Sequence, residues 1–182
     1  MRAESTIRYW ALKTREGRGG RDYWNRFLSD GVIAIGWNDI NVNPDEVSHE
    51  ELLDSLMRSY RYSEREAIIA ANTITKFINI GIGDKVLLCQ GYAPIHYREV
   101  HIYGVALVDE PFRDDRNSDW WRFKHKANIQ PLRAHGVNVP KDLLVQTLHR
   151  ESLLMTLHEI DREGFEELLA EINQRYRLNI IP

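Results

Sequence analysis

Apolar runs of strand length recur along the chain, separated by turn-forming or charged residues. These runs are residues 7–12, 32–37, 86–90, 97–102 and 103–108. They are rich in β-branched and aromatic side chains, and glycine, asparagine or aspartate lies near most of their ends, which is typical of buried strands. The first two-thirds of the chain therefore predict a sheet of several strands.

Two capping boxes mark the start of helices in the middle of the chain. The boxes are Ser48 with Glu51 and Ser63 with Glu66. In such a box the serine hydroxyl accepts from a backbone N–H inside the helix, and the glutamate accepts from the backbone N–H of the serine. The apolar stretches that follow, residues 52–60 and 67–80, are therefore expected to be helical.

Other segments have helical spacing or strand-like alternation. Residues 22–29 predict a short helix, with Gly31 where a left-handed cap would lie. Residues 142–148 and 161–176 carry apolar stripes of helical period. Residues 120–126 begin with two tryptophans and then alternate bulky and basic side chains, which predicts a half-exposed strand with one apolar and one basic face.

The order of these elements favours an α+β fold, with a small curved or barrel-like mixed sheet flanked by helices. No internal repeat and no Pro/Gly/Ser linker divides the chain, so residues 1–182 are expected to form a single domain. Its core is expected within about residues 7–133, and residues 140–178 are expected to form a C-terminal helical elaboration.

Composition narrows the class of protein. The 182 residues are 43% hydrophobic and 28% charged, an ordinary globular composition, and their formal net charge is -3. An acidic chain does not coat nucleic acid by bulk charge, so any nucleic-acid site must be local. No stretch approaches the roughly 20 apolar residues of a membrane span. The single Cys89 suits a reducing compartment, and we expect a cytoplasmic protein.

Motifs for catalysis are sparse. The sequence has no phosphate loop, dinucleotide fingerprint, paired-histidine zinc helix or nucleophile elbow. Cys89 lies in an apolar run, where a thiol is more often inert. Asp114 and Asp115 could serve a magnesium-dependent nuclease, but their mixed Arg/Asp surroundings are more typical of a solvated loop with ion pairs. No catalytic residue, cofactor or metal is therefore expected.

Aromatic residues at the ends of strand-like runs give the stronger signal. Trp37, Trp120 and Trp121 lie beside polar or charged residues, and Tyr92 follows another apolar run. Flat rings can sandwich a nucleobase, and stacking contributes about 1 to 3 kcal/mol per base. The alternative is that each tryptophan fills the core. One of Trp120 and Trp121 should point inward, because neighbours in a strand face opposite sides.

Basic residues gather around the first glycine-rich loop and around the tryptophan pair. The candidate phosphate ligands are Arg15, Arg18, Arg21, Arg116, Arg122, Lys124 and Lys126. Such residues could hold phosphates on either side of a pocket. Ordinary solvated surface charge is the alternative reading of both stretches.

Five short motifs occur in a fixed order along the chain. They are RYWALK (8–13), GVIAIGW (31–37), IGDKVLL (82–88), IYGVALV (102–108) and WRFK (121–124). Together they resemble the EVE and YTH branch of the PUA-like superfamily, and most nearly the N-terminal modified-DNA-reading domain of McrB-type restriction systems. The resemblance implies a small barrel that holds a flipped base in an aromatic cage. The helical segment 48–80 and the tryptophan pair depart from the YTH pattern.

The resemblance also implies roles for individual residues. By position, Trp37 is a cage residue, and Trp120 or Trp121 is its partner. Lys13 and Thr14 match polar residues that border the pocket in YTH domains. The candidates for reading the edge of the base are Lys13, Thr14, Asn38 and Asp39.

These expectations combine into a non-catalytic reader of a modified base in double-stranded DNA, acting as the specificity part of a restriction or defence protein. A nuclease or NTPase partner would lie on another domain or subunit. Two alternatives stay open. One is an RNA-binding module of the same fold that acts on tRNA or another modified RNA, and the other is a small metal-dependent hydrolase or nuclease that uses Asp114, Asp115 and a histidine.

Overall fold

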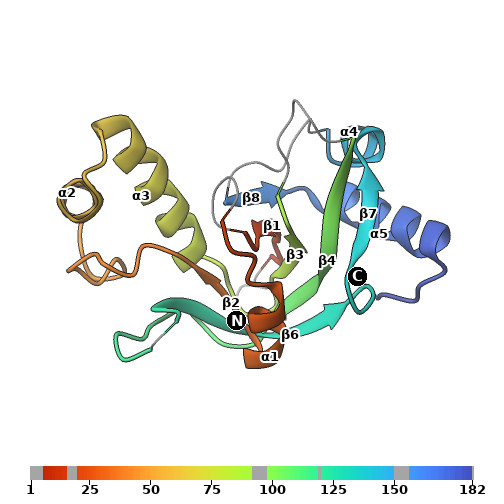
Figure 1. The fold of residues 1–182 in the computed structure, drawn as a ribbon, viewed down its shortest axis with the longest axis horizontal. Coiled ribbons are helices and arrows are strands. Elements are labelled where there is room, and N and C mark those ends of the chain that lie inside the picture. The colour runs from red at the N-terminus through yellow and green to blue at the C-terminus, as the bar shows by residue number, and fades with distance from the viewer. Residues whose placement is uncertain (1–5, 16–19, 92–97, 119, 150–155, 182) are drawn as a thin grey trace.

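The computed structural model describes residues 6–15, 20–91, 98–118, 120–149 and 156–181, and every structural statement below concerns these residues. Their strands form one mixed sheet with helices on both sides of it (Figure 1). The strands are β1 (Tyr9–Lys13), β2 (Val32–Ile35), β3 (Lys85–Cys89), β4 (Glu99–Val108), β5 (Arg113–Asp114), β6 (Phe123–Pro131), β7 (Val137–Pro140) and β8 (Leu157–Ile160). The helices are α1 (Trp24–Asp30), α2 (His49–Tyr60), α3 (Glu64–Ile78), α4 (Lys141–Leu148) and α5 (Arg162–Tyr176).

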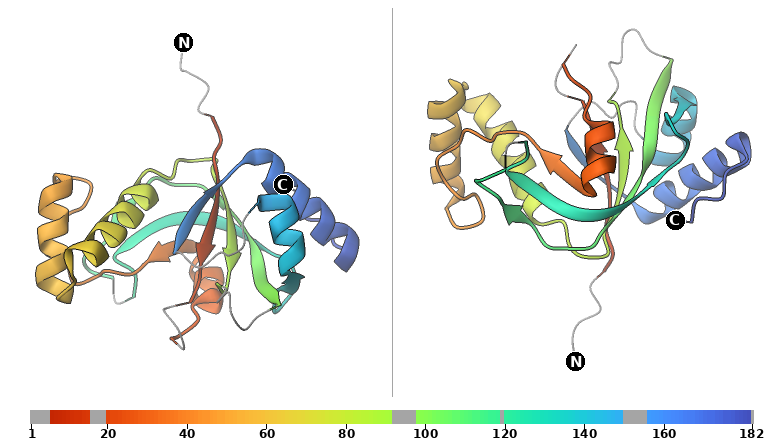
Figure 2. Two further views of the ribbon diagram at one scale, coloured as in Figure 1. Left: turned by 90° about the horizontal axis from the view of Figure 1, so that it is seen from above. Right: turned by 60° about the horizontal axis from the view of Figure 1, so that its bottom comes forward.

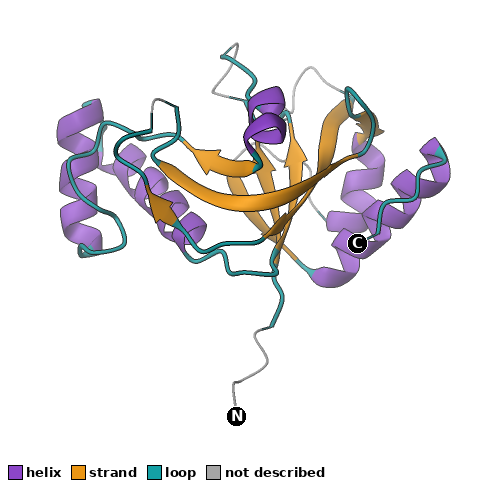
Figure 3. Ribbon diagram, turned by 90° about the horizontal axis from the view of Figure 1, so that it is seen from below, coloured by secondary structure: helices purple, strands orange, loops and turns teal. Residues whose placement is uncertain are grey.

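The sheet is curled by its two longest strands. Its path runs β2-β6-β4-β3-β1-β8, with β5 beside β6 and β7 beside β4. Only β1 and β3 are parallel among these described pairs. β4 pairs first with β7 and then with β6, and β6 pairs first with β2 and then with β4. Figures 2 and 3 show the resulting curvature. The expected α+β fold with a curved mixed sheet is confirmed.

Gly104 permits the close approach of β4 and β6 near the point where β4 changes partner. A Cβ atom at this position would lie 2.5 Å from the carbonyl oxygen of Gln130 and 3.1 Å from the ring of Trp24. Any larger side chain would therefore push the two strands or α1 apart. The glycine of the motif IYGVALV thus has a packing role.

Helices cover both faces of the sheet. Side chains of α1, α2 and α3 join the core on one face, and those of α4 and α5 join the core on the other (Figure 1). In β1, Trp10 and Leu12 point into the first core, whereas Tyr9 and Ala11 point into the second. Burial on both faces explains why the central strands read as continuous apolar runs. None of the helices within the described ranges is long and apolar enough to cross a membrane.

The predicted ends of several helices are confirmed. Both capping boxes are formed, with the hydroxyls of Ser48 and Ser63 accepting from the backbone N–H of Glu51 and Glu66. Gly31 has the left-handed φ of 62° expected of a helix cap. These local contacts satisfy backbone groups that the ends of a helix would otherwise leave unpaired.

The structure differs from the sequence prediction in three places. β7 and β8 were not expected: β7 lies between the predicted core and the predicted C-terminal helices, and β8 lies between two of those helices. β8 has only four residues, with Leu157 and Ile160 buried, which is too short a run for a clear alternating pattern. The two strands expected within 97–108 are the single strand β4. Trp120 and Trp121 precede β6 instead of belonging to it.

His125 is a buried titratable group at the contact between β6 and α3. Its Nε2 lies 2.8 Å from the carbonyl oxygen of Phe77, and its Nδ1 lies 3.3 Å from that of Glu110. The rings of Phe77 and Phe112 pack edge-on against the imidazole. Burial lowers the pKa of His125, while the two carbonyl oxygens and Asp84 oppose that shift. The surroundings in the folded protein therefore favour the neutral imidazole over the charged form.

This lowered pKa predicts loss of stability at mildly acidic pH. The unfolded chain protonates His125 near pH 6.5 whereas the folded chain resists, so the free energy of unfolding should be highest above that pH and fall as the pH drops from about 6.5 to 5. Urea unfolding of the wild type and His125→Gln across this range measures the effect. The variant should have a flatter profile, and equal pH slopes for the two proteins would contradict the assignment.

Candidate functional site

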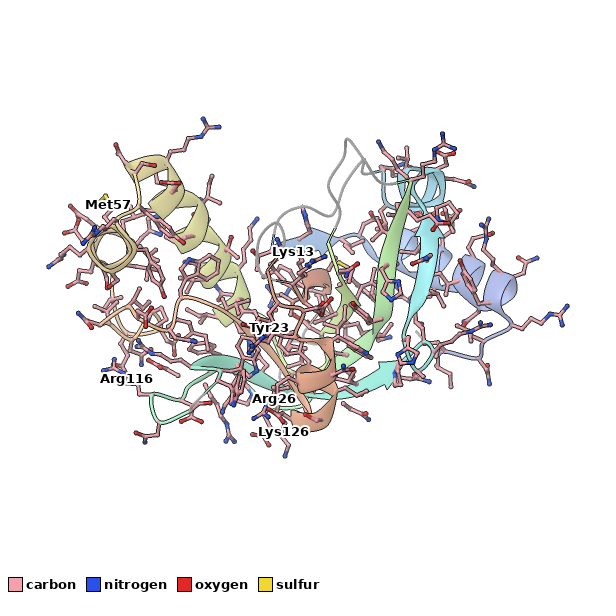
Figure 4. The ribbon with its side chains drawn as sticks, viewed as in Figure 1. Lys13, Tyr23, Arg26, Met57, Arg116 and Lys126 are labelled. Atoms are coloured by element: carbon pink, nitrogen blue, oxygen red, sulfur yellow. The ribbon has the colours of Figure 1, made fainter. Side chains whose placement is uncertain are left out.

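A cavity of about 260 Å³ lies where the ends of β1 and β2 approach α1 and the end of α2. Its aromatic wall consists of Tyr23, Phe27, Trp37, Tyr60, Tyr62 and Trp121. Its polar wall consists of Lys13, Thr14, Arg15 and Thr156. Figure 4 shows Lys13 and Tyr23 near the middle of the molecule, with the α2–α3 pair on one side and the strands β4 and β7 on the other. Apolar lining with a few polar groups is typical of small-molecule sites.

Trp37 is held in an unusual backbone conformation. Its φ of 69° lies in the left-handed region, which bulky residues rarely adopt. The indole Nε1 donates to the hydroxyl of Tyr62 over 3.3 Å. β2 has already ended at Ile35, so the left-handed turn directs the half-buried ring of Trp37 to the cavity. Strained residues of this kind cluster at functional sites.

Tyr60 and Tyr62 are wall residues that sequence analysis missed, as are Tyr23 and Phe27. The rings of Tyr60 and Tyr62 stack with centroids 5.3 Å apart and planes 23° apart. The hydroxyl of Tyr60 accepts from the backbone N–H of Asp39 over 3.0 Å, and burial raises the pKa of Tyr60. The only sequence signal was a pair of tyrosines where α2 gives way to the next capping box.

Trp121 forms the opposite part of the wall and is only 6% exposed. Its ring packs edge-on against Tyr23, with centroids 4.6 Å apart, and against Phe27, with centroids 5.3 Å apart. Its Nε1 is buried and finds no hydrogen-bond acceptor among the described residues. Leaving a buried N–H donor unpaired is costly. The indole N–H of Trp121 could therefore donate a hydrogen bond to an acceptor on a bound ligand.

Most of the polar wall lies at the end of β1 and just after it, at Lys13, Thr14 and Arg15. The hydroxyl of Thr14 lies 2.9 Å from the carboxylate of Asp22 and 3.3 Å from the carbonyl oxygen of Cys89. Arg15 donates through Nε to the carbonyl oxygen of Gly20 over 3.0 Å. Burial lowers the pKa of Lys13, because the low-dielectric surroundings disfavour its ammonium form. A ligand with acceptor or anionic groups would stabilise the ammonium form of Lys13 and so offset the cost of burying it.

Arg122 ties together the segments that carry the two tryptophans of the cavity. Its guanidinium binds the carboxylate of Asp114 through two contacts, of 2.6 and 2.8 Å. It also donates to the carbonyl oxygens of Asn38, Ile40 and Val42. Arg122 is 6% exposed and all its contacts lie inside the protein. The burial of Arg122 therefore contradicts the prediction that this residue binds a phosphate.

Asn38 and Asp39 also stabilise the wall instead of lining it. The Asn38 side chain accepts from the backbone N–H of Arg122 over 3.3 Å and donates to the carbonyl oxygen of Trp120 over 3.2 Å. The backbone N–H of Asp39 donates to the hydroxyl of Tyr60. Neither residue lines the cavity. Their positions therefore do not support the prediction that their side chains read the edge of a bound base.

The remaining predicted residues separate into three groups. Trp37, Trp121, Lys13, Thr14 and Arg15 meet at the cavity. Trp120, Arg21, Arg116, Lys124 and Lys126 lie outside its lining. Tyr92 and Arg18 lie outside the described residues.

Several outer basic residues are already paired. Lys124 contacts Asp115 at 2.6 Å, Lys126 contacts Glu110 at 3.1 Å, and Arg116 contacts Asp114 at 3.5 Å. The Arg/Asp run is therefore only partly the solvated loop that was expected, because the side chain of Asp114 is only 6% exposed. Among the described residues, no group of three His, Cys, Asp or Glu side chains could hold a metal ion.

Comparisons with known proteins show similarity at the level of the fold. No protein-family model matches the chain, and no curated protein sequence matches it. A hypothetical protein from Leishmania major is similar with a TM-score of 0.52 and 14% identity, over 96% of this chain and 100% of that chain. The YTH domain of Zygosaccharomyces rouxii MRB1 protein, in complex with N6-methyladenosine RNA, gives a TM-score of 0.49 and 12% identity, over 100% of this chain and 93% of that chain.

The buried ion pair predicts a large difference between two arginines that contact the same carboxylate. Arg122→Ala should lower the free energy of unfolding by about 3 to 5 kcal/mol, because it leaves the Asp114 charge buried without its main partner. Arg116→Ala, which removes the exposed partner of Asp114, should change it by no more than about 1 kcal/mol. Urea unfolding of both variants gives the comparison. Equal losses would contradict the role assigned to Arg122.

Proposed function

We propose that this chain binds a single modified nucleobase in the cavity and so acts as a reader of modified nucleic acid. The observation that carries the proposal is a cavity of about 260 Å³ walled by Trp37, Trp121 and three tyrosines. Pockets for drug-sized ligands measure about 300 to 1,000 Å³, so this one suits a smaller, flat group. Aromatic faces bind nucleobases by stacking, at about 1 to 3 kcal/mol per base.

The polar and basic residues support nucleic acid as the source of that base. Lys13 and Arg15 lie in the wall of the cavity, and Arg21 is exposed on the surface. Cationic side chains around a pocket can hold the phosphates that flank a bound nucleotide. A base inside a duplex must leave the stack to enter such a cavity, and a damaged, mismatched or unpaired base does so at least cost.

The polymer we propose is modified double-stranded DNA. This choice rests on the sequence resemblance to McrB-type readers, which also makes a restriction or defence system the proposed setting, with a nuclease or NTPase partner. A modified RNA is the other outcome of the test below. An RNA reader would use the 2′-hydroxyl and would prefer the ribose form of the same sequence.

Binding without catalysis is part of the proposal. The alternative hydrolase would need a free nucleophile or carboxylate. Cys89 is buried, and burial raises its pKa to about 12, so its thiol stays protonated at neutral pH. Asp114 is buried in its ion pair with Arg122, and Asp115 is paired with Lys124. These contacts favour structural roles for the groups that a hydrolase would use.

A panel of otherwise identical duplexes tests the proposal. The duplexes carry 5-methylcytosine, 5-hydroxymethylcytosine, 6-methyladenine or no modification, and the corresponding RNA strands form a second arm. We expect at least tenfold tighter binding to one modified duplex, which corresponds to about 1.4 kcal/mol. In the folded Trp37→Ala variant that preference should fall, with a loss of about 1 to 3 kcal/mol for the preferred duplex.

Two controls make the panel decisive. Tyr62→Phe keeps the ring but removes the hydroxyl that accepts from Trp37, so it should lose less affinity than Trp37→Ala. Unfolding curves on the same preparations separate binding from folding. Equal affinity across all modified and unmodified strands would contradict the proposed function, and undiminished preference in folded Trp37→Ala would remove Trp37 from the site.

A further inference from the structure

Trp120 is an exposed tryptophan beside the cavity. Its neighbour Trp121 is 6% exposed and forms the cavity wall, whereas Trp120 is 40% exposed and takes no part in that wall. The two residues precede β6 and turn their rings to different surroundings. What sets Trp120 apart is its place directly beside a wall residue of the cavity, because an aromatic face there lies within reach of a nucleotide next to the one in the cavity.

Two arginines lie over the ring of Trp120 as cation–π partners, and the residue stays 40% exposed beside them. The guanidinium carbon of Arg26 lies 4.8 Å from the ring centroid of Trp120, and that of Arg21 lies 5.9 Å from it. Arg26 also pairs with Asp30 at 2.7 Å. Both arginines lie within a few residues of Tyr23, which packs against Trp121 in the cavity wall. Figure 4 shows Arg26 on α1, close to Tyr23.

The backbone that carries Trp120 is fixed relative to the cavity. The side-chain amide of Asn38 donates to the carbonyl oxygen of Trp120 over 3.2 Å. The backbone N–H of Trp121 donates to the hydroxyl of Ser118 over 3.1 Å. Asn38 directly follows Trp37, so one side chain links the segments that bear the cavity ring and the exposed ring. The backbone at Trp120 is therefore held in place relative to the cavity without a ligand.

We propose that Trp120 is a second stacking site, which takes the nucleobase next to the one held in the cavity while Arg21 contacts the phosphate between them. This inference rests on the proposed function, because it assumes that the cavity holds a base. A flat ring beside two cations complements a flat, uncharged base joined to an anionic phosphate. Stacking of this kind is tolerant of sequence, so the site adds affinity without reading the neighbouring base.

The test removes each partner of the contact in turn. On the protein side, the variants are Trp120→Ala and Trp120→Phe. On the nucleic-acid side, the probes are the tightest-binding duplex of the panel above and two derivatives with an abasic site immediately 5′ or 3′ of the modified position. Trp120→Ala should weaken binding of the parent duplex about 5- to 150-fold. Trp120→Phe, which keeps an aromatic face, should recover most of that loss.

The abasic duplexes decide whether Trp120 meets the neighbouring base. With one of them, wild type and Trp120→Ala should bind within about twofold of each other, because the stacking partner is already gone. If Trp120→Ala costs the same factor in the parent and in both abasic duplexes, the inference is overturned. Arg162→Ala, an exposed arginine of α5 on the other face of the sheet, should leave all affinities unchanged.

The free modified nucleoside separates this inference from the proposed function. It can fill the cavity but has no neighbouring base, so Trp120→Ala should leave its affinity unchanged while Trp37→Ala weakens it. Equal loss of nucleoside binding in both variants would place Trp120 in the cavity and overturn the second site. If the wild type binds no nucleoside and prefers no modified duplex, the proposed function fails, and the abasic comparison still decides the role of Trp120.

Discussion

The candidate site depends on one buried guanidinium. Arg122 holds the carboxylate of Asp114 and the carbonyl oxygens of Asn38, Ile40 and Val42. Removing a guanidinium from water is costly unless its donors are all satisfied, and here they are satisfied by groups from separate segments. Because Trp121 precedes Arg122 and Trp37 precedes Asn38, this network sets the positions of the two indoles that face the cavity.

The aromatic wall forms where regular structure stops. Trp37 follows the end of β2 with a φ of 69°, and Arg61 ends α2 with a φ of 55°. Each left-handed residue turns the chain sharply, so that the rings of Trp37, Tyr60 and Tyr62 meet although they come from different elements. The rigid sheet and helices fix the ends of these turns, which gives the cavity a defined shape without a ligand.

The parts of the fold and of the candidate site that depend on local sequence patterns could be predicted from the sequence. Apolar runs and capping boxes identified most strands and helices. Strand ends suggested Trp37 and Trp121, and the family resemblance suggested Lys13; all three line the cavity. Tyr60 and Tyr62 were missed because their positions depend on how α2 packs, and Tyr23 was missed because its place in the wall depends on how α1 packs. Arg122 looked like its basic neighbours, and only its burial against Asp114 distinguishes it.

Resonances of the tryptophan indole N–H groups test the central claim most directly, because they report on individual rings of the folded protein. Titration with the free nucleosides of 5-methylcytosine, 5-hydroxymethylcytosine and 6-methyladenine should, for at least one of them, shift the Nε1–H signals of Trp37 and Trp121. The signal of Trp10, whose Nε1 donates to Asp84 over 3.0 Å in the core, should stay in place. Absence of any saturable shift at Trp37 and Trp121 with all three nucleosides would contradict a base-binding cavity.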